Sequence, residues 1–151
     1  MGAWGTWNIG MRFPDCFSAI VPFAGGLWMG DYNTETLGEQ YAPLIDNLKW
    51  LPSYCVDGDQ DNIVPTRFSR LLTEELKERR YDHTYVEIEG ANHFLNFDEN
   101  DSMMQEVIKW LQPRKRILHP PEVIHVIIDD DHPRQFGGLG FGVKPIGIEP
   151  G

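Results

Sequence analysis

The stretch LPSYCVDGDQDNIVP, residues 51–65, is the part of the sequence that decides the predicted fold. Its first six residues, 51–56, form an apolar run that is short enough for a buried strand. The residues that follow are polar and rich in aspartate, which is typical of a loop. The stretch therefore predicts a strand with an acidic side chain, Asp61, in the loop that follows it.

A second strand with a polar residue after it lies further along the chain. Residues 85–89 alternate in polarity, and His93 follows them after a glycine. Between the two strands, apolar residues recur at helical spacing and predict a helix from about residue 66 to 80. A right-handed crossover of this kind brings the ends of both strands to one edge of a parallel sheet. We therefore expect Asp61 and His93 to lie at the same edge.

Strands and helices alternate from Phe17 to Gln112, which predicts a parallel sheet covered by helices. A helix is expected over residues 2–13, a strand over 17–23, a helix over 41–48 and a last helix between Asp101 or Ser102 and Pro113. Residues 28–36 resemble a loop. The predicted buried faces of the first and last helices are Trp4, Trp7 and Met11, and Met104, Val107, Ile108 and Leu111.

The pattern changes after Pro113. Residues 122–128 are rich in β-forming side chains, and residues 137–142 are rich in glycine. We expect a first domain over residues 1–112 and a small β-rich appendage over residues 113–151, truncated or loosely ordered at its end.

Composition narrows the classes of partner. The chain has 151 residues, 41% of them hydrophobic, and a formal charge of -10, which argues against a nucleic-acid partner because phosphates repel such a surface. No apolar stretch approaches the length of a membrane span, and the N-terminus lacks a signal-peptide pattern. Cys16 and Cys55 have apolar neighbours and no CxxC spacing, so we expect buried free thiols and no zinc site.

Asp61 and His93 are the residue types that activate a serine nucleophile. The histidine takes the proton of the serine, and the acid holds the imidazole in the required tautomer. Two plainer interpretations exist, in which Asp61 is a turn residue and His93 a surface loop residue. The spacing of the aspartates at 57, 59 and 61 also imitates a calcium loop, but Asn62 and Phe68 occupy positions that need glycine and glutamate, which excludes an EF-hand.

Several motifs, in the same order, resemble the carboxyl half of an α/β-hydrolase catalytic domain from the prolyl-oligopeptidase and esterase group. Residues 1–7, MGAWGTW, are similar to the residues after the serine in that group's G-x-S-M-G-G-x-G-T-W motif. Residues 12–17 and 22–26 continue the match. Residues 57–65 resemble the acid motif H-G-x-x-D-x-x-V-P, with Asp57 in place of histidine, and residues 90–93 resemble G-x-x-H.

The resemblance implies a role for three positions. Asp61 is the catalytic acid, His93 is the base, and the backbone N–H of Met1 is an oxyanion-hole donor. The nucleophile serine is expected just before Met1 and is absent from the sequence. No metal or organic cofactor is implied. Four serines lack the glycine pattern of a nucleophile elbow and are rejected as replacements: Ser18, Ser53, Ser69 and Ser102.

The expected function is that of a fragment of a serine hydrolase that cleaves peptide or ester bonds, with a small-molecule or peptide substrate in the complete enzyme. One alternative is a non-catalytic remnant or interaction module with a hydrolase fold, and another is a carboxylesterase. Without its serine the chain is expected to be inactive. Because strands that would cover residues 17–23 are also missing, we expect self-association through an exposed sheet edge.

Overall fold

The computed structural model describes residues 1–27, 42–95, 97, 102–129, 135–136 and 141–142. Along the chain it contains α1 (Gly2–Arg12), η1 (Pro14–Cys16), η2 (Ala42–Trp50), β1 (Ser53–Gly58), α2 (Arg67–Glu78), β2 (His83–Ile88), α3 (Ser102–Leu111), β3 (Gln135–Phe136) and β4 (Phe141–Gly142). The helix expected over residues 41–48 is the 3-10 helix η2. The predicted loop at 28–36, Tyr41 and Asp101 lie outside the described residues.

The centre of the molecule is a parallel sheet. β1 pairs with β2 in the register Ser53 to His83 through Gly58 to Ile88. The segment around residues 20–24 lies along the other side of β1 and forms parallel β-bridges with it at Ile20 and Phe23. Every residue of β1 is buried, as expected for a central strand covered on both faces.

The strand predicted over residues 17–23 is interrupted, and Pro22 explains the interruption. Ile20 N–H donates to Pro52 O, Tyr54 N–H donates to Ile20 O, and Val56 N–H donates to Pro22 O. The bond that would complete this ladder runs from the amide of residue 22 to the carbonyl of Tyr54, and proline has no N–H. The segment therefore follows β1 as a third strand while forming only two isolated bridges.

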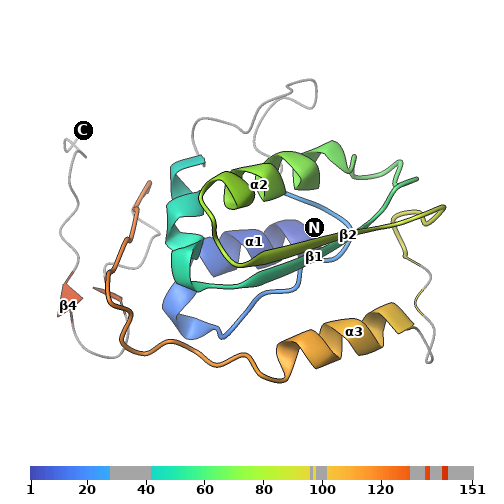
Figure 1. The fold of residues 1–151 in the computed structure, drawn as a ribbon. Helices are drawn as coiled ribbons and strands as arrows, with labels where there is room; N and C mark the ends of the chain where they lie inside the picture. The colour runs from blue at the N-terminus through green and yellow to red at the C-terminus, as the bar shows by residue number, and fades with distance from the viewer. Residues whose placement is uncertain (28–41, 96, 98–101, 130–134, 137–140, 143–151) are drawn as a thin grey trace.

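Helices cover both faces of the sheet (Figure 1). α1 and α2 pack on one face, where Trp7, Met11, Leu72 and Leu76 meet Cys55 of β1. α3 packs on the other face, where Val107 meets side chains of β1 that point the opposite way. The two faces alternate along β1, because successive side chains of a strand point to opposite sides.

The buried faces predicted for two helices, α1 and α3, are partly wrong. On α1, Ala3, Trp7, Gly10 and Met11 are buried, whereas Trp4 is 41% exposed. Gly10 lets α1 approach the sheet, since a Cβ there would lie 3.0 Å from the Ile20 side chain.

On α3 the buried residues are Met103 and Val107, Leu111 is partly buried, and Ile108 is 44% exposed. Met104, predicted to be buried, is only half-buried. Helical periodicity indicates that an apolar stripe exists, but the position of the sheet selects which line of side chains is covered.

The tail after α3 returns to the opposite end of the domain and passes η2 (Figure 1). The β-rich residues 122–128 do not form a strand, and within them Val126 bonds to the side chain of Asn47 through both its N–H and its C=O. Trp50 donates to Glu122 O, and Arg12 binds Asp129. The division of the chain at residue 113 stays a prediction.

The two cysteines differ in burial. Cys16 and Cys55 are free thiols. Cys55 is buried as expected, whereas Cys16, at the end of the short turn η1, is exposed.

Within the described ranges, none of the helices combines the length and apolar character that crossing a membrane requires.

Candidate active site

Asp61 and His93 are in direct contact at the carboxyl ends of β1 and β2. His93 Nδ1 lies 2.7 Å from Asp61 Oδ2. The other oxygen, Asp61 Oδ1, accepts the backbone N–H groups of Ile63 and Val64, each at 2.8 Å. The Asp61 side chain is fully buried, and that of His93 is 23% exposed. The structure thus brings together the two residues that the sequence places after successive strands.

The partners of Asp61 determine what the histidine can do. An ionised carboxylate only accepts hydrogen bonds, so opposite an ionised Asp61 the matching tautomer of His93 carries its proton on Nδ1 and donates to Oδ2. In the neutral imidazole the other nitrogen, Nε2, then has a free lone pair. The arrangement therefore suits a general base whose Nε2 accepts a proton from a neighbouring group.

The loops that carry Asp61 and His93 are joined by backbone bonds and by Asp59. Asp59 N–H donates to Ile88 O at 3.2 Å, and its carboxylate accepts the N–H of Gly90 at 2.7 Å. Gln60 N–H donates to Ala91 O at 2.9 Å. Sequence reasoning did not find this role of Asp59, because a loop aspartate gives no local sign of its partner.

Gly58, the last residue of β1, lies where the two loops approach most closely. A Cβ atom at this position would be 2.3 Å from Ala91 O and 2.7 Å from Asn92 O. Real Cβ atoms do not come so close to backbone oxygen, so any larger residue would push the histidine loop away. Glycine is thus required here by the spacing between the two loops.

Asp57 joins a third loop to the same region. Its Oδ1 accepts the N–H of Gly25 at 2.7 Å, and its Oδ2 accepts the hydroxyl of Tyr85 at 3.2 Å. Burial raises the pKa of Asp57 above its ordinary value, and the hydrogen bonds to its carboxylate oppose that shift. Asp57 therefore holds the chain after Phe23 against β1, another role that the sequence did not indicate.

The first turn of α1 lies beside the acid loop. A Cβ at Gly25 would be 3.4 Å from the Cβ of Ala3 and 3.2 Å from Cγ1 of Val64, so these two residues flank one glycine. Met1 is exposed, and its carbonyl accepts Gly5 N–H at 2.9 Å. The oxyanion-hole role of Met1 stays a prediction.

Two exposed apolar side chains, Phe94 and Ile63, lie in the loops of the candidate pair. Phe94 is 73% exposed, and its ring meets the His93 ring edge-on with 5.8 Å between centroids. Ile63, whose N–H bonds to the Asp61 carboxylate, is also exposed.

The rejected Ser53 begins β1, at the end of the strand opposite to Asp61, and is buried. Among the described residues, His, Cys, Asp and Glu form no group of three that could hold a metal ion.

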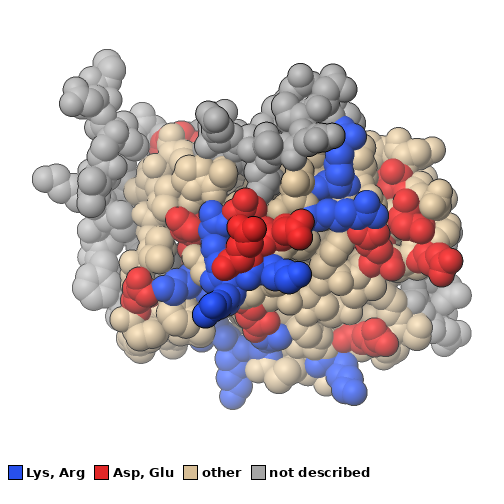
Figure 2. Space-filling model, turned by 45° about the horizontal axis from the view of Figure 1, so that its top comes forward, with Lys and Arg blue, Asp and Glu red and all other residues tan. Residues whose placement is uncertain are grey.

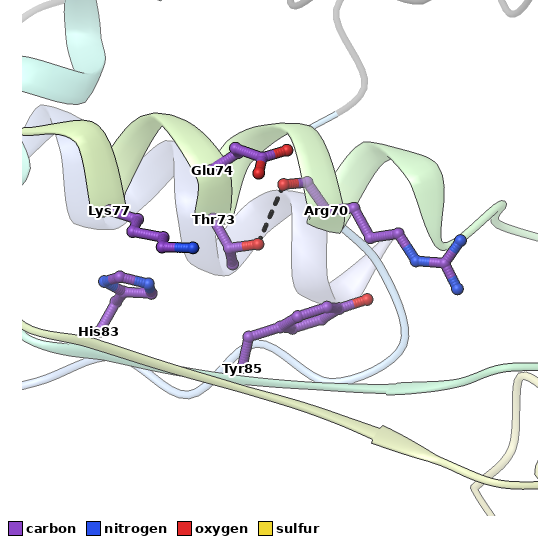
Figure 3. A pocket seen from close by; sticks show the side chains of 6 residues that line it. All are labelled: Arg70, Thr73, Glu74, Lys77, His83 and Tyr85. Carbon is purple, nitrogen blue, oxygen red and sulfur yellow. Dashed lines mark hydrogen bonds between the residues drawn. The ribbon is translucent and has the colours of Figure 1, made fainter.

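A separate hollow of 340 Å³ lies between α2 and β2 (Figure 3). Lys77 and His83 lie near each other at one end and Arg70 at the other, with the ring of Tyr85 between them. Arg70 is engaged by Glu87 through two bonds of 2.6 Å, and His83 Nδ1 bonds to Tyr81 O. The lining residues do not include Asp61 or His93, so this hollow is distinct from the candidate site.

No protein-family model and no curated protein matches the sequence. Among solved structures, the chain is similar to a thermostable esterase, with 29% identity over 75% of this chain and 28% of the esterase, at a TM-score of 0.55. It is also similar in fold to esterase PE8, with 19% identity over 75% of this chain and 46% of that protein, at a TM-score of 0.53. The chain thus spans less than half the length of either esterase. With its parallel strands, covering helices and this likeness, the chain has a partial α/β-hydrolase fold.

Proposed function

We propose that Asp61 and His93 are the acid and the base of a serine hydrolase that acts on ester bonds. The observation that carries the proposal is the 2.7 Å contact between His93 Nδ1 and Asp61 Oδ2, made by a fully buried carboxylate at the end of a parallel strand. The similarity to the thermostable esterase supports a hydrolase kind of function. The motif order supports the wider prolyl-oligopeptidase and esterase group, and it is the esterase likeness that favours esters over peptides.

The proposed reaction takes its nucleophile from residues outside this sequence. The serine Oγ attacks the acyl carbon while its proton passes to His93 Nε2, and the Asp61 carboxylate stabilises the imidazolium that forms. His93 then returns the proton to the leaving alcohol as the ester C–O bond breaks. Water, activated by the same nitrogen, hydrolyses the acyl-serine and regenerates the enzyme.

The first test uses the 151-residue chain itself. We expect no hydrolysis of a p-nitrophenyl ester above the uncatalysed rate, because an oriented histidine without a positioned serine has little to activate. A fluorophosphonate should likewise label no serine in a time-dependent way. Time-dependent labelling of any of the four serines would reveal a second nucleophile and would contradict this part of the proposal.

The second test uses a longer form that carries G-x-S ahead of Met1. In that form His93→Ala and Asp61→Asn should each lower kcat by about 10³-fold or more, since each removes proton transfer or its tautomer control. Asp57→Asn should have a far smaller effect, because Asp57 contacts Gly25 and Tyr85.

Asn62→Ala is the matched control for these variants, since Asn62 is an exposed residue directly after the acid. An essential role for Asp57 would show that the assignment of the acid is wrong. If the longer form has no activity although it is folded and carries its serine, the non-catalytic alternative replaces the hydrolase proposal.

A further inference from the structure

The loop that carries His93 begins with a tight turn at the end of β2. Ala91 N–H donates to Ile88 O at 3.2 Å, which closes a turn over residues 88–91. Gly90 has a φ of 71°, in the left-handed region that glycine favours at the third residue of a β-turn. The N–H of this third residue takes no part in the bond that closes the turn. It is therefore free to bond to a group outside the turn.

Asp59 supplies the acceptor for that N–H. Its Oδ1 lies 2.7 Å from Gly90 N. Asp59 N–H also donates to Ile88 O at 3.2 Å, so the residue is bonded to the turn through both its backbone and its side chain. Asp59 stands two residues before Asp61, and Gly90 stands three residues before His93. The side-chain bond therefore links the loops of the proposed acid and base within a few residues of each.

Local preference alone does not give the histidine loop its shape. Leu95, two residues after His93, has a φ of 56° although it is not a glycine. This conformation is costly for a residue with a Cβ and persists only where surrounding contacts fix it. Asn92 provides one such contact, because its Oδ1 accepts the N–H of Phe94 at 2.9 Å. The bond to Asp59 fixes the other end of the loop.

We propose that Asp59 is a positioning residue whose carboxylate holds the turn after β2, so that Nδ1 of His93 stays within bonding distance of Asp61. This inference rests on the proposed function, since the position of the imidazole matters to catalysis if His93 is the base. The bond of Asp59 lies at the surface, and the backbone bond from Gln60 N–H to Ala91 O joins the same loops. Loss of the carboxylate should therefore loosen the histidine loop without releasing it.

Two variants separate the bond of Asp59 from its charge. Asp59→Asn keeps an oxygen that can accept the N–H of Gly90, whereas Asp59→Ala removes the acceptor. Both variants lose the negative charge, so a difference between them is due to the bond. A control for charge is still needed, because the face that carries α2 is crowded with charged side chains of both signs (Figure 2). Glu89→Ala removes the same charge from an exposed residue of the same turn and leaves the bond at Gly90 in place.

The test is the tautomer of His93 in the 151-residue chain, read from the ¹⁵N chemical shifts of the imidazole at a pH where the ring is neutral. Contact with Asp61 should hold the natural chain in the tautomer that carries its proton on Nδ1. In Asp59→Ala the ratio of this tautomer to the other should fall about three- to tenfold, the factor that one net hydrogen bond represents. Asp59→Asn and Glu89→Ala should stay within about twofold of the natural ratio, which is less than the loss of one bond. Slow exchange of the Tyr54 amide in β1 shows that each variant keeps its sheet.

Activity gives a second measurement in the longer form that carries G-x-S. There Asp59→Ala should lower kcat by about three- to tenfold with KM little changed, and Asp59→Asn should restore it. An unchanged tautomer ratio in folded Asp59→Ala would overturn the proposal. So would an equal loss in Asp59→Asn or Glu89→Ala, since charge would then be responsible. Failure of the hydrolase proposal looks different: the tautomer ratio responds as expected, but the longer form hydrolyses no ester.

Discussion

The two carboxylate oxygens of Asp61 have different partners. Oδ1 accepts two backbone N–H groups of its own loop, which fixes the rotation of the carboxylate, and Oδ2 is thereby directed at His93. The first arrangement is an ordinary turn in which a side chain bonds to the backbone a few residues on. The interpretation of Asp61 as a turn residue therefore does not conflict with its proposed functional role, because each uses a different carboxylate oxygen.

Asp57 predicts a pH dependence of stability. Burial raises its pKa in the folded protein above the ordinary value of 3.8. The folded state then binds the proton more strongly than the unfolded state does, so this residue lowers the free energy of unfolding as the pH rises from about 4 through its folded pKa. Asp57→Asn should be as stable as the natural chain near pH 4 and at least as stable at pH 7, because an amide oxygen can still accept the N–H of Gly25.

Denaturant unfolding at several pH values between 4 and 7 measures this effect. Asp57→Ala is the comparison: it leaves Gly25 N–H without its acceptor and should cost about 1–3 kcal/mol throughout that range. If Asp57→Asn loses as much stability at pH 7 as Asp57→Ala does, the charged carboxylate stabilises the fold and the predicted sign of the pH dependence is wrong.

At the scale of elements, Asn47 connects three parts of the chain. From η2 its amide nitrogen donates to Met11 O in α1 and to Val126 O in the tail, each at 2.9 Å, and its oxygen accepts Val126 N–H at 2.6 Å. The side chain thus pairs with the backbone of Val126, in a segment that has no strand partner among the described residues. Residues 122–128 are held against η2 by a side chain.

Asn47→Ala should release the tail from η2. We expect the free energy of unfolding to fall by about 1–3 kcal/mol, since buried backbone groups of Met11 and Val126 lose their partner. Trypsin should also cut faster at residues 114–116, just before the released segment. Lys49→Ala, which removes an exposed ion pair with Glu122 and a contact with the ring of Trp50, should change stability by less than about 1 kcal/mol. Equal effects of the two substitutions would contradict the role assigned to Asn47.

At the scale of the whole molecule, helices cover the central strand on both of its faces. β1 is buried along its whole length between β2 and the segment around residues 20–24. Within the described residues, neither residues 20–24 nor β2 pairs with a further strand on its outer side.

The amino-acid sequence by itself determined the order and type of the elements in α1, α2, β1, β2 and α3, and it placed Asp61 and His93 at one edge of a sheet. These features follow from local periodicity and from position after a strand, which neighbouring residues specify. Their contact in the structure fits that expectation. The catalytic roles of Asp61, His93 and Met1 stay predictions.

Only the tertiary structure decided which partners the remaining residues have. It exposed Trp4 and Ile108 and split the third strand at Pro22. It also gave Asp57 and Asn47 hydrogen-bond partners far along the chain, such as Gly25 for Asp57 and Val126 for Asn47. The physical reason is that the burial and pairing of a side chain depend on groups that the folded chain brings near it. A local pattern shows that such a side chain is polar or apolar, but the partner is chosen by the packing of the whole domain.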